Sequence, residues 1–233
     1  MMVKVDHLSY NFGSYWALKD ISFSLDKGEF LFLTGHSGAG KTTLLRLLYG
    51  ALPVKRGRVQ VAGMQLNRLK KRHVPILRRK VGVVFQDFKI LPKRTVFDNV
   101  AMALEVRGMP RTHLERRVRA IVRAMGLESK SYSQCERLSG GEQQRVAIAR
   151  SMVANPELIL ADEPTGNLDF DLTMHLMDIF KQFNTYGTTV IMATHSREVL
   201  DCVPEARILH LEDGRIVTEG ADDEDIPYGE EFA

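Results

Sequence analysis

The chain has 233 residues, enough for one large domain with a well-buried core. Its 32 basic and 29 acidic residues give a net charge of +3, which argues against a dedicated nucleic-acid-binding protein. Cys135 and Cys202 lie far apart and outside any cysteine or histidine cluster, which excludes a typical zinc site and a disulfide framework. Neither a secretory signal nor a run of ~18 apolar residues is visible, so we expect a cytoplasmic protein that reaches a membrane only through a partner.

In the first third of the chain, short apolar runs alternate with one helical segment. Two runs alternate apolar with polar residues, which is typical of antiparallel strands, and a third is continuously apolar and ends at Gly35, as a buried parallel strand would. The very basic stretch 68–80 is most simply a solvated surface. The predicted elements are strands over 3–9, 20–25, 30–33, 59–62 and 81–85, and a helix from about residue 41.

Helical periodicity replaces the strand signals between about residues 87 and 150. We therefore predict an α/β domain over residues 1–220, with a helical subdomain inserted at about 87–150, followed by an acidic tail over 221–233. The predicted elements are helices over 95–107, 113–125 and 142–154, then strands over 158–161 and 189–193, a helix near 172–183, and a hairpin over 207–218.

A glycine-rich loop directly follows the third predicted strand. Its sequence, Gly35-His36-Ser37-Gly38-Ala39-Gly40-Lys41-Thr42, fits the GxxxxGK[ST] pattern of a phosphate-binding loop. Glycines let the backbone approach an anion, and the N–H groups from residue 38 to Thr43 would point at a β-phosphate at the positive end of the next helix. Lys41 would reach the β- and γ-phosphates, and the Thr42 hydroxyl would bind Mg²⁺. The strand before the loop and the helix after it disfavour an ordinary glycine-rich turn.

Two adjacent acids, Asp162 and Glu163, end the apolar run that starts at Leu158. Because the chain turns at the carboxyl end of a strand, both side chains can face the same crevice. Asp162 suits the Walker-B role of holding Mg²⁺ through its water shell, and Glu163 is then placed to polarise the water that attacks the γ-phosphate. Alone, two acids after a strand could equally well cap a helix. Beside a phosphate loop, we interpret them as catalytic.

A second helix also opens on glycines, at Leu138-Ser139-Gly140-Gly141-Glu142-Gln143. Ser139 and Glu142 have the spacing of a capping box, which explains these two residues without a ligand. The paired glycines weaken a first helical turn unless something must approach its backbone, and an anion docking there would explain them. The residues leave both interpretations open, and they do not say whose anion it would be.

Together these segments resemble the nucleotide-binding subunits of the ATP-binding cassette (ABC) family, whose signature sequence is similar to 138–143. The resemblance covers nearly the whole chain. It implies an α/β P-loop NTPase fold with an antiparallel β subdomain and a helical insertion, and an ATPase that uses ATP and Mg²⁺. In the family two subunits pack head to tail, so Ser139, Gly140 and Gly141 would cap the γ-phosphate bound to the other copy in a homodimer.

The resemblance also assigns roles to three residues that carry little signal alone. Gln86, after the predicted strand 81–85, corresponds to the glutamine that contacts Mg²⁺ and the lytic water. Asp169, in Asn167-Leu168-Asp169, corresponds to the loop at the dimer seam, and His195 to the switch histidine at the γ-phosphate. Without the family context they would be a polar strand end, a helix cap and a buried histidine. The predicted catalytic residues are then Lys41, Gln86, Glu163 and His195.

The family stacks an aromatic residue of its first hairpin on the adenine ring. This chain offers Tyr10, Phe12, Tyr15 and Trp16 there. The spacing to the following Ala17 favours Phe12, with Tyr15 second. Any of the four could instead be a packing residue.

A narrower resemblance, carried by His36, is to the cell-division branch of the family. The stretch 161–169 fits that branch too, but lipoprotein-release and macrolide-efflux ATPases share it, so these and solute importers stay open as the alternative. The branch implies an integral membrane subunit and divisome proteins as partners, the cytoplasmic face of the inner membrane as location, and control of septal cell-wall hydrolases. We expect the groove for the membrane subunit after Gln86, around Phe88, Ile90, Leu91 and Met102. No nucleic-acid partner is expected.

Overall fold

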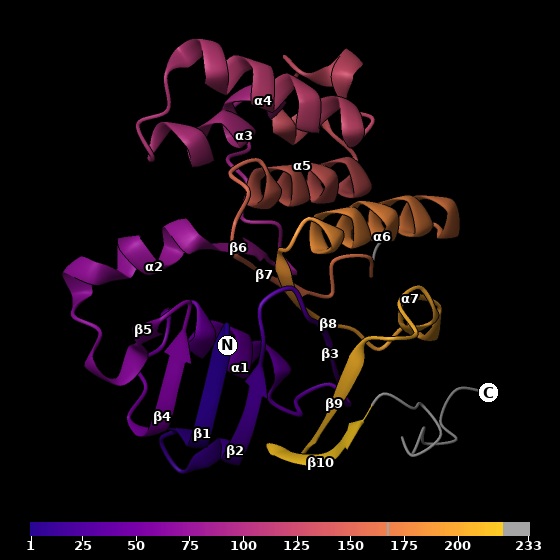
Figure 1. Cartoon of the computed structure of the whole chain (residues 1–233). Coiled ribbons are helices and arrows are strands. Elements are labelled where there is room, and N and C mark those ends of the chain that lie inside the picture. Colours follow the sequence, from indigo (N-terminus) through magenta and orange to yellow (C-terminus); the bar gives the residue numbers. More distant parts are fainter. Residues whose placement is uncertain (167, 221–233) are drawn as a thin grey trace.

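The computed structural model describes residues 1–166 and 168–220, and it contains two sheets and a block of helices (Figure 1). Asn167 and the predicted acidic tail lie outside the described residues. The strands are β1 (Val3–Phe12), β2 (Tyr15–Leu25), β3 (Phe30–Thr34), β4 (Arg56–Val61), β5 (Met64–Gln65), β6 (Val81–Val84), β7 (Leu158–Asp162), β8 (Thr189–Ala193), β9 (Arg207–Glu212) and β10 (Arg215–Gly220). The helices are α1 (Lys41–Leu48), α2 (Val74–Lys80), α3 (Val96–Glu105), α4 (Arg111–Ala124), α5 (Gly140–Met152), α6 (Phe170–Thr185) and α7 (Arg197–Asp201).

The strands form one antiparallel and one mainly parallel sheet. The antiparallel sheet has the order β2-β1-β4-β5, and the larger sheet has the order β10-β9-β3-β8-β7-β6. In the larger sheet β9, β3, β8, β7 and β6 run parallel, and β10 pairs antiparallel with β9. The carboxyl ends of the parallel strands β3, β6, β7 and β8 therefore lie at one edge of the sheet. Doubly wound sheets bind ligands at this edge.

Strand β3 shows why the central strands are continuously apolar. Phe30 and Phe32 pack into a core shared with helices α3 to α6, whereas Leu31 and Leu33 pack into a second core shared with α1 and the antiparallel sheet. Because successive side chains point to opposite faces, burial of both faces removes any need for polar residues. The phosphate loop thus begins from a strand that is fixed on both sides.

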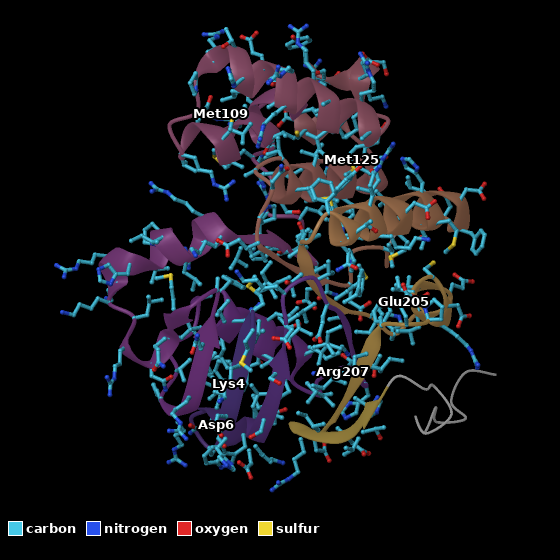
Figure 2. All side chains as sticks on the ribbon, in the orientation of Figure 1. Lys4, Asp6, Met109, Met125, Glu205 and Arg207 are labelled. Carbon is cyan, nitrogen blue, oxygen red and sulfur yellow. The ribbon has the colours of Figure 1, made fainter. Side chains whose placement is uncertain are left out.

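The helices α3, α4 and α5 stack on the side of the molecule opposite the antiparallel sheet (Figure 1). Figure 2 shows Met125, which follows α4, among the side chains packed between these helices, and Met125 is fully buried. Buried Asn99 of α3 ties the block to the chain that enters it, because its amide bonds the backbone N–H and carbonyl of Leu91 at 2.8 and 3.0 Å. The division of the chain at about residues 87 and 150 stays a prediction.

The basic stretch 68–80 is more ordered than expected. It contains helix α2, and the side chain of Leu77 in this helix is fully buried. The prediction of a plain solvated surface is therefore wrong for this residue, because one apolar side chain among many basic ones is enough to dock a short helix.

Candidate active site

A cavity of about 660 Å³ opens where the phosphate loop meets the ends of β6, β7 and β8. This volume is in the range of ordinary small-molecule sites. Every predicted residue of the phosphate loop contributes to it, together with the predicted metal and catalytic side chains. The lining residues are Phe12, Tyr15, Ala17, Gly35, His36, Ser37, Gly38, Ala39, Gly40, Lys41, Thr42, Thr43, Gln86, Asp162, Glu163 and His195.

The phosphate loop takes its shape from glycines that no other residue replaces without strain. Gly40 caps α1 with a φ of 111°, and a Cβ atom there would lie 2.6 Å from the carbonyl oxygen of Ala17. The ammonium group of Lys41 donates to the carbonyl oxygens of Gly35 and, at 3.1 Å, of His36. Burial lowers the pKa of Lys41, while the nearby Glu163 and Asp162 act in the opposite direction. Lys41 is thus held within the loop by weak neutral acceptors that an anion can replace.

Asp162 and Thr42 together form an oxygen-rich corner suited to a hard cation. Burial raises the pKa of Asp162, and its hydrogen bond with the Thr42 side chain acts against that rise. A hydroxyl, a carboxylate and the Gln86 amide are ligands that Mg²⁺ accepts. In the described part of the chain no group of three or more His, Cys, Asp or Glu side chains could hold a metal by itself. Mg²⁺ is usually held by one or two protein carboxylates together with substrate phosphates.

Glu163 and His195 are in direct contact, although they are far apart in the sequence. Nδ1 of His195 lies 2.9 Å from Oε1 of Glu163. Because a carboxylate can only accept, the Nδ1 atom carries the proton in this contact. Glu163 has a φ of 49°, which is uncommon for a residue with a side chain, and its backbone N–H is fixed by the carbonyl of Ala193 at 3.0 Å. A strained residue held by the neighbouring strand is common at functional sites.

The four candidate aromatic residues have different surroundings in the structure. Phe12 and Tyr15 line the cavity, and both are exposed. Tyr10 is buried and packs edge to face against Phe12, with the ring centroids 5.0 Å apart. Trp16 is covered by the guanidinium of Arg56, 4.9 Å from the ring centroid. Only Phe12 and Tyr15 are therefore placed to meet a base in the cavity.

Four predicted site residues do not line this cavity. Ser139 and Gly140 lie on the exposed start of α5, next to Gly141. The capping box is present, since the Ser139 side chain accepts from the Glu142 N–H at 3.3 Å and the Glu142 carboxylate accepts from the Ser139 N–H at 2.9 Å. Asp169 caps α6 and accepts from the Leu172 N–H at 2.9 Å. Their roles toward a nucleotide remain predictions.

Helix α5 carries two contacts that sequence reasoning missed. The buried amide of Gln144 donates to the carbonyl oxygen of Pro164, next to Glu163, at 2.6 Å. The guanidinium of Arg150 donates to the carbonyl oxygens of Phe88 and Lys89, at 2.9 and 2.8 Å. Both side chains bind backbone atoms, which carry no sequence signal, so no pattern of residue types could have indicated these pairs.

The groove expected after Gln86 for a membrane subunit stays a prediction, and the cavity nearest to it has a different lining. A second cavity, of about 690 Å³, lies between α2, β6 and the ends of α3 and α5, and we call it the α2–α3 groove. Of the four predicted residues only Met102 lines it, whereas Ile90 packs against the large helical core. The groove residues are Tyr49, Ala51, Pro75, Arg78, Arg79, Val81, Gly82, Val83, Phe85, Lys89, Met102, Ala103, Val106, Arg107, Arg150, Ser151 and Ala154.

Comparison with known proteins agrees with this site. A model of the ABC transporter family matches residues 18–166. The cell division ATP-binding protein FtsE of Streptococcus pneumoniae is 47% identical over 201 residues, covering 86% of this chain and 87% of that protein. FtsE of Mycobacterium tuberculosis is 47% identical over 219 residues, 93% and 95% of the two chains, and FtsE of Escherichia coli K12 is 44% identical over 216 residues, 92% and 97%.

A solved structure shares the whole fold. A dimeric ATP-binding cassette in a post-hydrolysis state, bound to ADP and Pi, matches with a TM-score of 0.87 at 33% identity, over 94% of this chain and 97% of that one. This confirms the predicted fold class. In the described residues, no helix is long and apolar enough to cross a membrane. Because the family model covers more than half of the chain and the phosphate loop and paired acids share one cavity, the chain belongs to the ABC transporter family and is an ATPase.

Proposed function

We propose that two copies of this chain close head to tail around two Mg-ATP and act as the motor of a bacterial cell-division complex. The observation that supports a dimer is the position of the second glycine-opened helix. Ser139 and Gly140 are exposed and do not line the cavity formed by their own phosphate loop. A second copy would bring an equivalent helix start to the open side of that cavity, where its N–H groups favour an anion.

Ser139 can serve both its own helix and a phosphate. Its oxygen accepts the Glu142 N–H, and this leaves the hydroxyl proton free to donate. The Glu142 carboxylate is paired with Lys130, whose ammonium lies 2.5 Å from it. This pair and the bond from the Ser139 N–H lower the pKa of Glu142, Lys130 having the larger effect. The exposed helix start therefore presents donors, while its one acid is occupied.

Catalysis in the closed dimer would consist mainly of positioning and charge stabilisation. Lys41 would leave the loop carbonyls for the phosphates, and Thr42, Asp162 and Gln86 would hold Mg²⁺, which supplies charge neutralisation when bound. Glu163 would polarise the attacking water. The contact with His195 would orient the Glu163 carboxylate, and since both side chains line the cavity, His195 would then meet the γ-phosphate.

The membrane partner that we propose is an integral subunit of the FtsX type. The support is the sequence identity of 44–47% with relatives named cell division ATP-binding protein FtsE. Such a subunit would hold the chain at the cytoplasmic face of the inner membrane, and closure on ATP would control septal cell-wall hydrolases, together with divisome proteins. The alternative is the ATPase of a lipoprotein-release, macrolide-efflux or solute-import transporter, which would use the same ATP site.

The first test is affinity capture of the tagged Glu163→Gln variant from native membranes with Mg-ATP, followed by mass spectrometry. This variant should hydrolyse ATP about 10²–10⁴-fold more slowly, because its general base is lost, and it should stay in the closed dimer. We expect it to retain an FtsX-type subunit. The matched control is the Lys41→Ala, Glu163→Gln double variant, which lacks the phosphate contact and should remain monomeric.

Recovery of a lipoprotein-release or importer permease in place of an FtsX-type protein would overturn the cell-division assignment and leave the ATP site standing. A Glu163→Gln variant that hydrolyses ATP at the wild-type rate would instead overturn the assignment of the general base.

A further inference from the structure

A strongly basic surface lies just before helix α2, outside both the catalytic cavity and the α2–α3 groove. Residues 30–86 contain no Asp or Glu, although the whole chain has a net charge of only +3. Within this stretch four exposed basic side chains stand almost next to one another. We call them the basic patch: Arg68, Lys70, Lys71 and Arg72. A local excess of positive charge in a nearly neutral protein favours an anionic partner.

The charges of the basic patch have no carboxylate partner within the described part of the chain. Other basic residues nearby in the sequence do have one, since Arg58 pairs with Asp6 at 2.6 Å and Lys80 pairs with Glu157 at 3.1 Å. No ion pair joins a residue of the patch to an Asp or Glu in residues 1–166 or 168–220. An external anion therefore meets charges that the described fold has not already neutralised.

The fold anchors this segment on its apolar side, so that its basic side chains face outward. Leu66 and Leu77, before and after the patch, are buried in the core shared with α1 and the antiparallel sheet, and Leu69 packs against the same core. A Cβ atom built at Gly50 would lie 3.7 Å from Leu69 and 3.3 Å from Leu77, so these two anchors reach the same place. A partner therefore binds a segment that is already ordered, which lowers the entropy cost of binding.

An apolar side chain lies on the exposed side of the same segment. Ile76 is 46% exposed, whereas its neighbour Leu77 is fully buried. Segments that bind membrane surfaces combine Lys and Arg with apolar side chains that enter the headgroup region. Single-stranded nucleic acids are instead bound largely through aromatic side chains on which bases stack, and residues 66–80 contain no Phe, Tyr or Trp. This combination favours a lipid surface over a nucleic acid.

We propose that the basic patch contacts the headgroups of anionic phospholipids, with Ile76 entering the interface beside them, and gives the chain a second attachment to the membrane. This rests on the proposed function, because it takes the chain to be held at a membrane by a partner. Each Lys or Arg close to an anionic membrane strengthens binding about fivefold, so four of them give roughly a 10²–10³-fold gain. That gain is too small for stable anchoring alone, but it adds to the attachment that the partner provides.

The test is co-sedimentation of the purified full-length protein with two kinds of vesicle. One kind is phosphatidylcholine alone, and the other mixes phosphatidylcholine and phosphatidylglycerol in about a 2:1 ratio. We expect binding to the mixed vesicles at about 1 mM lipid and none to the neutral vesicles. Raising sodium chloride to about 0.5 M should release the protein, because salt screens the charges. Equal binding to both kinds of vesicle, or no binding to either, would overturn the proposal.

Charge reversal locates the binding surface. The double variant Lys70→Glu, Lys71→Glu should bind the mixed vesicles at least about 100-fold more weakly, because two attractive charges become repulsive. The matched control is the double variant Arg116→Glu, Arg119→Glu on α4, which changes the net charge by the same amount and should bind nearly as the wild type does. All four side chains are exposed, so both variants should unfold at the wild-type temperature. If the control loses binding equally, net charge is responsible and the patch is not the binding surface.

The apolar side chain distinguishes a lipid surface from other anions. Ile76→Ser should weaken binding to the mixed vesicles about 2- to 10-fold, because less apolar area enters the interface. Inorganic phosphate at constant ionic strength should not displace the protein from the vesicles. If inorganic phosphate does displace it, the patch is a site for free phosphate. If a single-stranded DNA oligonucleotide binds more tightly than the vesicles and loses that binding in Lys70→Glu, Lys71→Glu, the patch is a nucleic-acid site. Either result would overturn the proposal.

The chain's own acidic residues 221–233 are a second candidate occupant of the basic patch. Truncation after Gly220 should leave binding to the mixed vesicles in place or strengthen it. If only the truncated protein binds, the acidic residues occupy the patch in the full-length chain and the lipid inference is wrong.

Failure of this inference differs from failure of the proposed function. The vesicle experiment contains no membrane subunit, so its result holds even if affinity capture recovers none. Capture of a membrane subunit without binding to the mixed vesicles would leave the proposed function standing and overturn the lipid inference. Binding to the vesicles without capture of a membrane subunit would overturn the proposed function and leave the basic patch as a lipid-binding surface.

Discussion

The guanidinium of Arg150 donates a 2.9 Å hydrogen bond to the carbonyl oxygen of Phe88. Phe88 has a φ of 59°, and Lys89, which Arg150 also binds, has a φ of 48°. Left-handed residues other than glycine are strained and persist only where their surroundings hold them. Arg150 stands in the last turn of α5, whose first turn carries the signature glycines. Helix α5 thus connects two places. Its start should meet the partner's nucleotide, and its last turn holds the segment that follows Gln86.

Substituting Arg150 with Ala should lower the free energy of unfolding by about 1–3 kcal/mol, because two carbonyl groups lose charged donors. It should also lower kcat, because the turn after Gln86 is no longer held. Arg150→Lys keeps the positive charge but has one ammonium group in place of the forked guanidinium. It should therefore have a smaller effect on both the free energy of unfolding and kcat. Urea denaturation and steady-state ATP hydrolysis measure the two quantities. An Arg150→Ala enzyme that is less stable but has unchanged kcat would limit Arg150 to a structural role.

Glycines at the two phosphate-type helix starts should respond differently to a methyl group. At Gly40, alanine meets both an unfavourable φ and the carbonyl oxygen of Ala17 at 2.6 Å, so Gly40→Ala should destabilise the monomer by at least about 1 kcal/mol. At Gly140 a Cβ atom meets nothing within 4 Å, so Gly140→Ala should leave the monomer unchanged or stabilise it by up to about 1 kcal/mol.

Gly140→Ala should nevertheless reduce ATP-driven dimerisation, since the methyl group keeps the partner's γ-phosphate away from the helix start. Analytical ultracentrifugation with Mg-ATP in the Glu163→Gln background measures this. If Gly140→Ala dimerises as well as the parent, the glycine is not kept for close approach of a ligand, and the capping box alone explains the sequence.

Binding of the adenine ring of ATP should depend more on Phe12 than on the hydroxyl of Tyr15. Stacking of one base on an aromatic ring contributes about 1–3 kcal/mol, so Phe12→Ala should weaken ATP binding roughly 5- to 150-fold. Tyr15→Phe removes only a hydroxyl whose contact with the Gly38 carbonyl oxygen is long, at 3.5 Å, and should change the affinity little. Isothermal titration with ATP under non-hydrolysing conditions compares them. A larger loss of ATP affinity in Tyr15→Ala than in Phe12→Ala would assign the stacking on adenine to Tyr15 in place of Phe12.

His7 should make the stability of the antiparallel sheet depend on pH. Its Nδ1 lies 2.7 Å from Asp20, and its Nε2 lies 3.7 Å from Asp6, which Figure 2 labels on β1. The hydrogen bond to Asp20, then the charges of Asp20 and Asp6, raise the pKa of His7 above its ordinary value of 6.5. The folded protein therefore binds this proton more tightly than the unfolded chain does. Its contribution to stability is fully present below pH 6.5 and is lost as the pH rises through the folded pKa.

Asp20→Asn should consequently lower the pKa of His7, as followed by NMR of the imidazole protons. The stability difference between wild type and Asp20→Asn should be larger on the acid side of pH 6.5 than at alkaline pH. A difference that stays constant across this range would mean that Asp20 acts through the backbone and not through the charge of His7.

Much of the fold could be predicted because the informative patterns are local. The strand over 30–33, the paired acids after 158–161 and the helices of the middle segment all appear within about two residues of where periodicity placed them. Phosphate binding also has a local signature, since it needs glycines and a lysine in one short loop. The side-chain contacts between Glu163 and His195 and between Gln144 and Pro164 have no such signature, because each joins segments that are distant in sequence.

The sequence by itself determined the phosphate loop, the paired acids and the capped, glycine-opened helix, because each of these requires particular residue types at fixed spacing along one segment. Only the tertiary structure decided which aromatic residues line the cavity, that the signature helix stands apart from its own phosphate loop, and that five basic side chains line one groove. The groove depends on how α2, α3 and α5 pack around β6, whereas the aromatic lining of the cavity depends on how the turn between β1 and β2 lies against the phosphate loop. Packing is set by burial over the whole core, and no short stretch of sequence records it.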